Sequence, residues 1–106
     1  MKKKKPVWGD KVYVAGKITH TDLAKTKRRF ARKEIELSEM CVVKYNPMKS
    51  VDLNKPLKPW LFYMKVGIGN LMNCNSIYML KGWRRSKGAR IERWLAKKLK
   101  YDVYYE

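Results

Sequence analysis

The sequence predicts an α/β fold, a small three-layer sandwich in which helices cover both faces of a four-stranded parallel sheet. Short apolar runs ending at glycine or at Asn-Pro alternate along the chain with longer segments of helical periodicity. The resulting order is β-α-β-α-β-α-β, and strands separated by helices run parallel with right-handed crossovers. We therefore expect the strand order 2-1-3-4 of a trimmed doubly wound fold, of the flavodoxin or Rossmann-like kind.

The first strand is predicted at residues 11–16, a nearly continuous apolar run closed by Gly16, as in a buried strand. A helix follows to about Glu39, and either Thr21 or Asp22 can cap its start. Apolar residues repeat on one side of this helix, and bases fill most of the remainder. The apolar side consists of Leu23, Ala24, Phe30, Ala31, Ile35 and Leu37.

The second strand is predicted at residues 40–45 and stops at Asn46-Pro47. A polar loop containing prolines covers residues 48–59. Residues 60–73 have a helical pattern, which is weakened by two internal glycines that each cost about 1 kcal/mol relative to alanine.

The last third of the chain repeats the alternation of strand and helix. A strand is predicted at residues 76–80, followed by a basic loop at 82–88. The last helix is predicted at 89–99 and the last strand at 102–105, with its two tyrosines on a half-exposed edge.

Composition indicates one folded domain at residues 11–106, preceded by a flexible basic tail at residues 1–10. The 106 residues are 45% hydrophobic and 12% aromatic, which is typical of a globule with a single core. The net charge of +17 predicts attraction to phosphates on nucleotides, nucleic acid or other acidic surfaces.

Several classes of protein are disfavoured by the sequence. Cys41 and Cys74 lack metal-ligand spacing, and only His20, expected at the surface, could accompany them. We expect both cysteines to be reduced core residues, with no metal and no cofactor. No apolar run approaches the roughly 18 residues of a membrane span, and the lysine-rich start lacks the apolar segment of a secretory signal. A cytoplasmic location is expected.

Glu92 is the most informative single residue. In a chain with 26 Lys and Arg residues, it has no base three or four positions away, where helix ion pairs form. Its neighbours at helical spacing are Gly88, Ala89, Leu95 and Ala96. A carboxylate on such a face, near a helix start, is either a cap or core-edge residue paired from elsewhere in the fold, or a functional group.

Topology points to the same residue. In open parallel sheets, ligands bind beyond the carboxyl ends of the strands, where the strand order reverses. Here the reversal lies between the first and third strands. Residues 16–19, 46–47 and 81–88 reach that edge, and the last helix begins there, so Glu92 is expected at the lip of the crevice.

From residue 11 onward, the chain resembles small bacterial and phage proteins of unknown function that are grouped with the nucleoside 2-deoxyribosyltransferases. Each matching piece is short, and their order makes the set specific. The pieces are Val12-Tyr13-Val14-Ala15-Gly16-Lys17-Ile18-Thr19, residues 30–36, residues 43–47, Pro59-Trp60, Ser76-Ile77-Tyr78-Met79-Leu80-Lys81-Gly82-Trp83, Ser86-Lys87-Gly88-Ala89-Arg90-Ile91-Glu92, and Tyr104-Tyr105-Glu106.

The resemblance implies a role for Glu92 as the nucleophile that attacks the anomeric carbon of a deoxyribose and displaces the base. Tyr13 would order this carboxylate or the sugar. Ser86 and the following amides would hold a hydroxyl or a 5′-phosphate at the helix start. Three glycines would let the backbone approach the ligand closely: Gly16, Gly82 and Gly88.

Other residues on these loops complete the predicted ligand site. Lys17 and Asn46 follow the first and second strands, and Lys87 belongs to a basic cluster expected to contact ligand phosphate. Trp83 is the preferred candidate for stacking on a base.

The chain also departs from its relatives. They commonly carry an aspartate in the second helix and another at the opening of the third strand, where this chain has Gly67 and Asn75. Asp52 is the better substitute and Glu106 the other, although Asp52 could equally cap a turn. Relatives are often dimers or larger, so we expect a homo-oligomer.

Three functions remain open at this point. The first is an enzyme that acts on the N-glycosidic bond of a nucleoside or nucleotide, by deoxyribosyl transfer or by hydrolysis. The second is a catalytically impaired protein that binds or sequesters a nucleotide, of phage or bacterial origin. The third is a basic accessory protein that binds nucleic acid, for which the helix beginning near Asp22 is the main feature.

Overall fold

The computed structural model describes residues 10–18, 21–39 and 42–106. It confirms an α/β fold with one parallel four-stranded sheet in the predicted order, β2-β1-β3-β4. The strands are β1 (Lys11–Ala15), β2 (Val42–Tyr45), β3 (Ser76–Met79) and β4 (Asp102–Tyr105).

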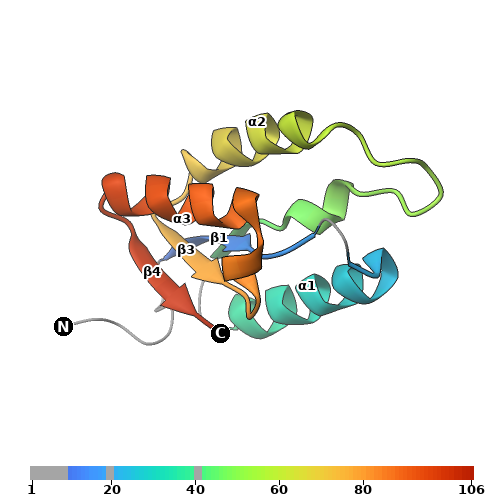
Figure 1. Cartoon of the computed structure of the whole chain (residues 1–106). Helices are drawn as coiled ribbons and strands as arrows, with labels where there is room; N and C mark the ends of the chain where they lie inside the picture. Colours follow the sequence, from blue (N-terminus) through green and yellow to red (C-terminus); the bar gives the residue numbers. More distant parts are fainter. Residues whose placement is uncertain (1–9, 19–20, 40–41) are drawn as a thin grey trace.

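Three helices form the outer layers of the sandwich (Figure 1). α1 (Leu23–Ser38) covers one face of the sheet, while α2 (Trp60–Leu71) and α3 (Lys87–Lys98) cover the other. Two short 3₁₀ turns, η1 (Pro47–Ser50) and η2 (Trp83–Arg85), follow β2 and β3.

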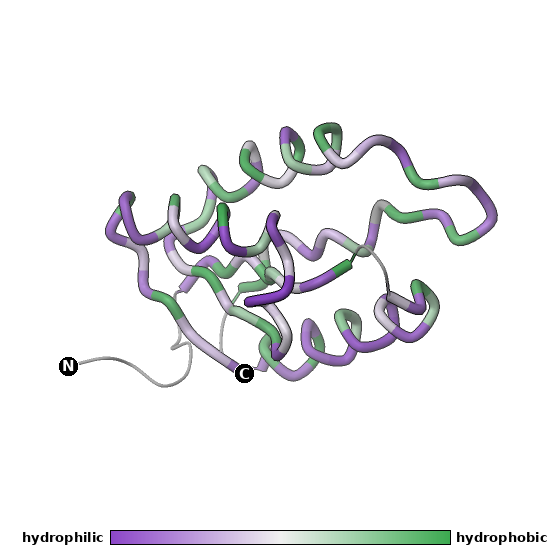
Figure 2. Tube along the Cα trace, in the orientation of Figure 1, coloured by the Kyte–Doolittle hydropathy of each residue, from purple (hydrophilic) through white to green (hydrophobic). Residues whose placement is uncertain are grey.

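Alternation along the strands divides the core into two halves. Val12 and Val14 point toward α1 and pack with Phe30, which is fully buried. Tyr13 and Ala15 point to the other face and pack in the cluster that includes α3. Successive side chains of a strand face opposite sides of the sheet, so β1 contributes to both halves. Its hydrophobic residues lie at the centre of the molecule in Figure 2.

The helix starts explain small differences from the predicted bounds. Asp22 caps α1, because its side chain accepts a hydrogen bond from the Lys25 amide at 3.2 Å. Ser86 caps α3 by accepting from the Ala89 amide at 3.1 Å, so this helix begins two residues earlier than expected.

The segment predicted as a polar loop at residues 48–59 contains η1 and contributes to the core. Asn46 caps the turn by accepting a hydrogen bond from the Met48 amide at 3.0 Å. Met48 and Val51 are then buried against α1. The apolar residues at these two positions, rather than the polar majority, determine how the segment folds.

Both ends of the described domain are held in place. Asp10, assigned above to the tail, is buried, and its carboxylate accepts a hydrogen bond from Tyr104 Oη at 2.7 Å. Tyr104 is therefore a core residue and not half exposed. Glu106 pairs with Arg29 at 2.7 Å and accepts from the Lys81 amide at 2.8 Å, and these partners lower its pKa against the effect of burial.

In the part of the chain that the structure describes, no helix is long and apolar enough to cross a membrane, and no group of His, Cys, Asp and Glu residues could hold a metal. Cys74 is buried, as predicted. Cys41, His20 and the lysines of the tail lie outside the described residues.

Candidate active site

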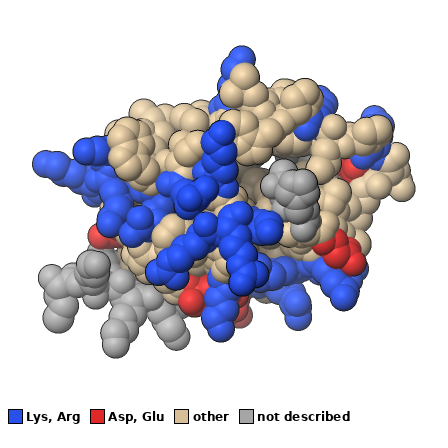
Figure 3. Space-filling model, in the orientation of Figure 1, with Lys and Arg blue, Asp and Glu red and all other residues tan. Residues whose placement is uncertain are grey.

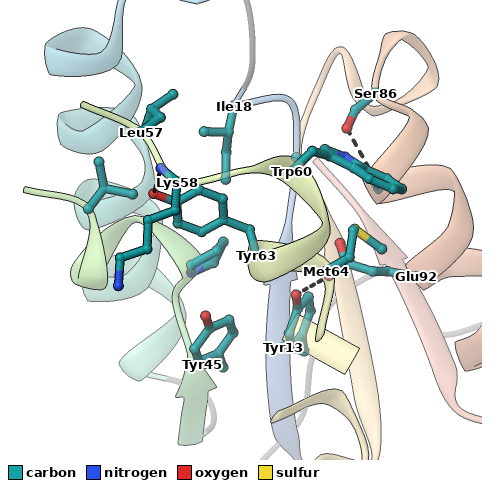
Figure 4. A pocket seen from close by; sticks show the side chains of 15 residues that line it. Tyr13, Ile18, Tyr45, Leu57, Lys58, Trp60, Tyr63, Met64, Ser86 and Glu92 are labelled. Atoms are coloured by element: carbon teal, nitrogen blue, oxygen red, sulfur yellow. Dashed lines mark hydrogen bonds between the residues drawn. The ribbon is translucent and has the colours of Figure 1, made fainter. Parts of the chain in front are cut away.

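A cavity opens beside β1, between α2, α3 and the loop that precedes α2. It measures about 760 Å³ when the solvent at its mouth is included. Figure 4 shows the side chains that enclose it. The wall consists of Tyr13, Gly16, Ile18, Tyr45, Pro47, Val51, Leu57, Lys58, Trp60, Tyr63, Met64, Ser86, Gly88, Ala89 and Glu92.

Glu92 and Tyr13 form a hydrogen-bonded pair at the inner end of this cavity. Tyr13 Oη donates to Glu92 Oε2, and the two residues come from β1 and α3 (Figure 4). Glu92 is 8% exposed and Tyr13 only 1%. Glu92 is therefore not a solvated surface acid, and none of the ion pairs between described residues involves it, in agreement with the spacing argument from the sequence.

Burial changes the acidity of both groups. It raises the pKa of Glu92 to about 7, and the hydrogen bond from Tyr13 opposes part of that rise. Burial and the nearby Glu92 carboxylate raise the pKa of Tyr13 well above its usual value. Tyr13 therefore keeps its proton and acts as the donor, while Glu92 can exchange its proton near neutral pH.

Gly67 allows α2 to approach this pair. A Cβ at position 67 would lie 2.6 Å from Tyr13 Oη and 2.8 Å from Glu92 Oε2, closer than van der Waals contact permits. The Tyr13 hydroxyl thus occupies the space that a side chain at this position would need. Position 67, where the resemblance described above predicts an acidic residue, therefore lies directly at the site.

Two alanine substitutions in α2 should have opposite effects on stability. Gly67→Ala forces the buried Tyr13–Glu92 pair apart, so we expect a loss of about 1–3 kcal/mol in the free energy of unfolding. Gly69 has nothing within 4 Å of its Cβ position, so Gly69→Ala should add about 0.5–1 kcal/mol. Urea unfolding of both variants tests this contrast, and equal effects would contradict the close approach at Gly67.

Aromatic side chains form much of the cavity wall. The Tyr13 and Tyr45 rings stack with their centroids 5.2 Å apart. Trp60 lies at the start of α2 with Lys87 Nζ 5.0 Å from its ring centroid, and Tyr63 Oη accepts from the Lys58 amide at 3.0 Å. The wall can thus bury a flat ring, while cations lie near its rim.

Three of the predicted binding residues lie in the cavity wall. Gly16 is buried where a Cβ would lie 3.0 Å from Leu80 Cβ, and Gly88 where it would lie 2.9 Å from Met64 Sδ. Both glycines therefore permit close packing of the walls. The Ser86 hydroxyl borders the cavity while it accepts from the Ala89 amide, so its proton remains available to a ligand.

Asp52 is not brought to Glu92, in contrast to its predicted role as a substitute acid. It is exposed, and its side chain accepts from the Asn54 amide at 2.9 Å. It therefore caps a turn, the alternative left open above. Asn46 is also absent from the wall, because it is buried between the Met48 amide and Glu34, to which it donates at 3.0 Å.

Trp83 lies outside the cavity as well, so the structure does not bring it to the wall where it was expected to stack on a base. Its ring packs near Tyr105, with centroids 6.0 Å apart, and between Arg84 and Arg93. Gly82 has a φ of 90° at the start of η2 and is needed for that turn. Lys17 is half-buried and, like Lys87, is not part of the wall.

The sequence did not single out Tyr45, Tyr63 or Lys58. Tyr45 is the last residue of β2, and the ligand was predicted to bind beyond the carboxyl ends of the strands. Its position in the sequence could therefore have identified it as a cavity residue. Tyr63 and Lys58 reach the cavity only because the loop before α2 folds back, and no local pattern indicates that path.

The model of a family described as a domain of unknown function, DUF4406, matches residues 10–105. The chain belongs to the DUF4406 family. The match includes every described strand and helix, and it begins at Asp10, the first residue that the structure describes. No curated protein and no solved structure matches the chain.

Proposed function

We propose that the protein acts on the N-glycosidic bond of a nucleoside or nucleotide, with Glu92 as the nucleophile. The observation that carries this proposal is a buried carboxylate, held by Tyr13, at the inner end of an aromatic cavity. A carboxylate in such a place can attack an acetal carbon, and aromatic walls suit a base and a sugar.

In the proposed first step, a Glu92 carboxylate oxygen attacks C1′ of the sugar as the bond from C1′ to the base nitrogen breaks. The base leaves with the electron pair of that bond and takes a proton from solvent. Water, or a nitrogen of a second base, then attacks C1′ and breaks its bond to Glu92. This second step restores the carboxylate and gives hydrolysis with water, or transfer with a base.

Tyr13 is the proposed positioning residue. Its hydroxyl fixes one oxygen of Glu92 and favours the ionised form, which is the nucleophile. Gly67 makes room for that hydroxyl where relatives are expected to carry an acid. Tyr13 would thus orient the carboxylate without supplying a second acid.

The charge of the leaving base should determine the rate of the reaction. Glu92 is the only carboxylate among the described residues of the cavity wall, so no second acid is available there to protonate the leaving base. We expect deoxynucleosides of N7-methylated purines, whose bases carry a positive charge before they leave, to react faster than unmodified ones. Chromatography of free base after incubation with matched deoxynucleosides, with and without a 5′-phosphate, measures this. Equal rates for both kinds of base would contradict it.

A second candidate is a nucleotide-binding protein with little or no catalysis, and the missing second acid favours it. Such a protein would gain thermal stability from nucleotides without releasing base. The same incubations distinguish the two candidates, because only the enzyme produces free base. Self-association, the cytoplasmic location and a phage or bacterial origin remain proposals beside this one.

A further inference from the structure

The outer face of α3 carries lysine and arginine side chains that no described acid neutralises. Among residues 81–101, Glu92 is the only acidic residue, and it is buried in the cavity. The ion pairs between described residues involve Arg29, Lys33 and Lys49, and none involves α3 or η2. The bases here are Lys81, Arg84, Arg85, Lys87, Arg90, Arg93, Lys97, Lys98 and Lys100.

These bases gather over α3 and η2. Figure 3 shows Lys and Arg covering the side of the molecule where Figure 1 places α3. By contrast, two of the six bases of α1 form ion pairs: Arg29 with Glu106, and Lys33 with Glu36 and Glu106. Of these two basic helices, α3 is the one whose bases form no ion pair between described residues.

Exposed aromatic rings lie among these bases. Trp94 is 59% exposed, although a tryptophan is usually buried, and Lys98 Nζ lies 5.7 Å from its ring centroid. Arg90 and Lys98 are each four residues from Trp94, so all three share one side of the helix. The stripe of basic and aromatic side chains along this side of α3 runs from Lys87 to Lys98 and is about 16 Å long. This length corresponds to about five phosphates of a nucleic-acid strand with stacked bases.

A second aromatic group borders the stripe at η2 and β4. Tyr105 is 41% exposed, and its hydroxyl accepts a hydrogen bond from Arg93 Nε at 2.8 Å. The Arg93 guanidinium also lies 4.8 Å from the Trp83 ring centroid. Rings and cations thus alternate across the surface formed by η2, the outer side of α3 and the end of β4.

We propose that this surface, which we call the α3 face, binds single-stranded nucleic acid. Cations arranged along a helix follow a phosphate backbone, and an exposed indole stacks on a base only where that base is not already stacked in a duplex. The carboxylates of an acidic protein would satisfy the charges but offer Trp94 no ring to stack on, whereas every nucleotide supplies both a phosphate and a flat base. The proposal does not depend on any chemistry in the cavity.

Fluorescence anisotropy with a labelled oligothymidylate tests the proposal on the full chain. Trp94→Ala should weaken binding about tenfold or more, because a stacked base is lost. Replacing Arg90, Lys97 and Lys98 together by Gln should weaken it further and reduce the slope of log affinity against log salt by about 2, at roughly 0.7 for each lost phosphate contact. The matched control replaces three exposed bases of α1, namely Lys25, Arg28 and Arg32, by Gln and removes the same charge.

The proposal is supported if the α3 variants lose far more affinity than the α1 control and a duplex of equal length binds more weakly. It is overturned if the two charge variants lose affinity equally, which would indicate diffuse attraction to the whole molecule. No effect of Trp94→Ala, equal affinity for duplex, or binding only to vesicles of anionic lipid would also overturn it. Circular dichroism of each variant verifies that the fold is intact.

Discussion

Replacing Glu92 by Gln should reduce the rate of base release at least about a thousandfold. Gln keeps the shape of the side chain and can still accept the hydrogen bond from Tyr13, but its amide oxygen is a poor nucleophile. Chromatography of free base from the best deoxynucleoside substrate measures the effect. Activity within tenfold of the wild type would remove Glu92 from the mechanism.

The pH profile of the wild type identifies the ionised group. Because burial raises the pKa of Glu92 to about 7, kcat/KM should rise with pH below 7 and level off above it. Tyr13→Phe removes the hydrogen bond that lowers this pKa, so its profile should shift to higher pH while the plateau remains measurable. A merely structural role of Tyr13 would lower the rate without moving the midpoint.

Glu92→Gln should also make the protein more stable at neutral and alkaline pH. Glu92 has a usual pKa of 4.5, which we take for the unfolded chain, and a folded value of about 7. Between these values the folded protein binds more protons than the unfolded chain, so its stability falls as pH rises. The loss is complete above pH 7 and amounts to roughly 3 kcal/mol. Gln carries no charge at any pH, so the Glu92→Gln variant does not lose this stability.

Urea unfolding of the wild type and Glu92→Gln at about pH 5 and pH 8 measures this effect. We expect the two proteins to differ little at the lower pH and by roughly 3 kcal/mol at the higher one, or on the order of 10 °C in Tm. Glu39→Gln, at the exposed end of α1, is the matched control for loss of a carboxylate. A constant difference between wild type and Glu92→Gln at both pH values would show that Glu92 is not a buried acid.

The sheet could be predicted from the sequence because its determinants are local. Residues 11–16 and 76–80 are short apolar runs, and the helical segments between strands require parallel pairing. The crossover order then places the end of β1 and the start of α3 at one edge. Glu92 could be singled out for the same reason, because its lack of basic neighbours is visible within two helical turns.

The rest of the site depends on contacts between distant segments. Tyr13 and Glu92 are 79 positions apart, and their hydrogen bond forms only when β1 and α3 pack together. Asp52 was expected near Glu92, yet burial of Val51 against α1 directs this loop so that Asp52 remains in solvent. Trp83 and Trp60 both lie near helix starts, and only tertiary packing determines that Trp60 lines the cavity.

Covalent trapping tests the proposed role of Glu92 most directly. A deoxynucleoside with fluorine at C2′ slows both steps, and a good leaving base restores the first, so a sugar–enzyme ester should accumulate. Mass spectrometry of the intact protein and of its peptides should find one added fluorosugar, on Glu92, and none in Glu92→Gln. Base release by the wild type with no adduct, or with an adduct on another residue, would contradict nucleophilic attack by Glu92.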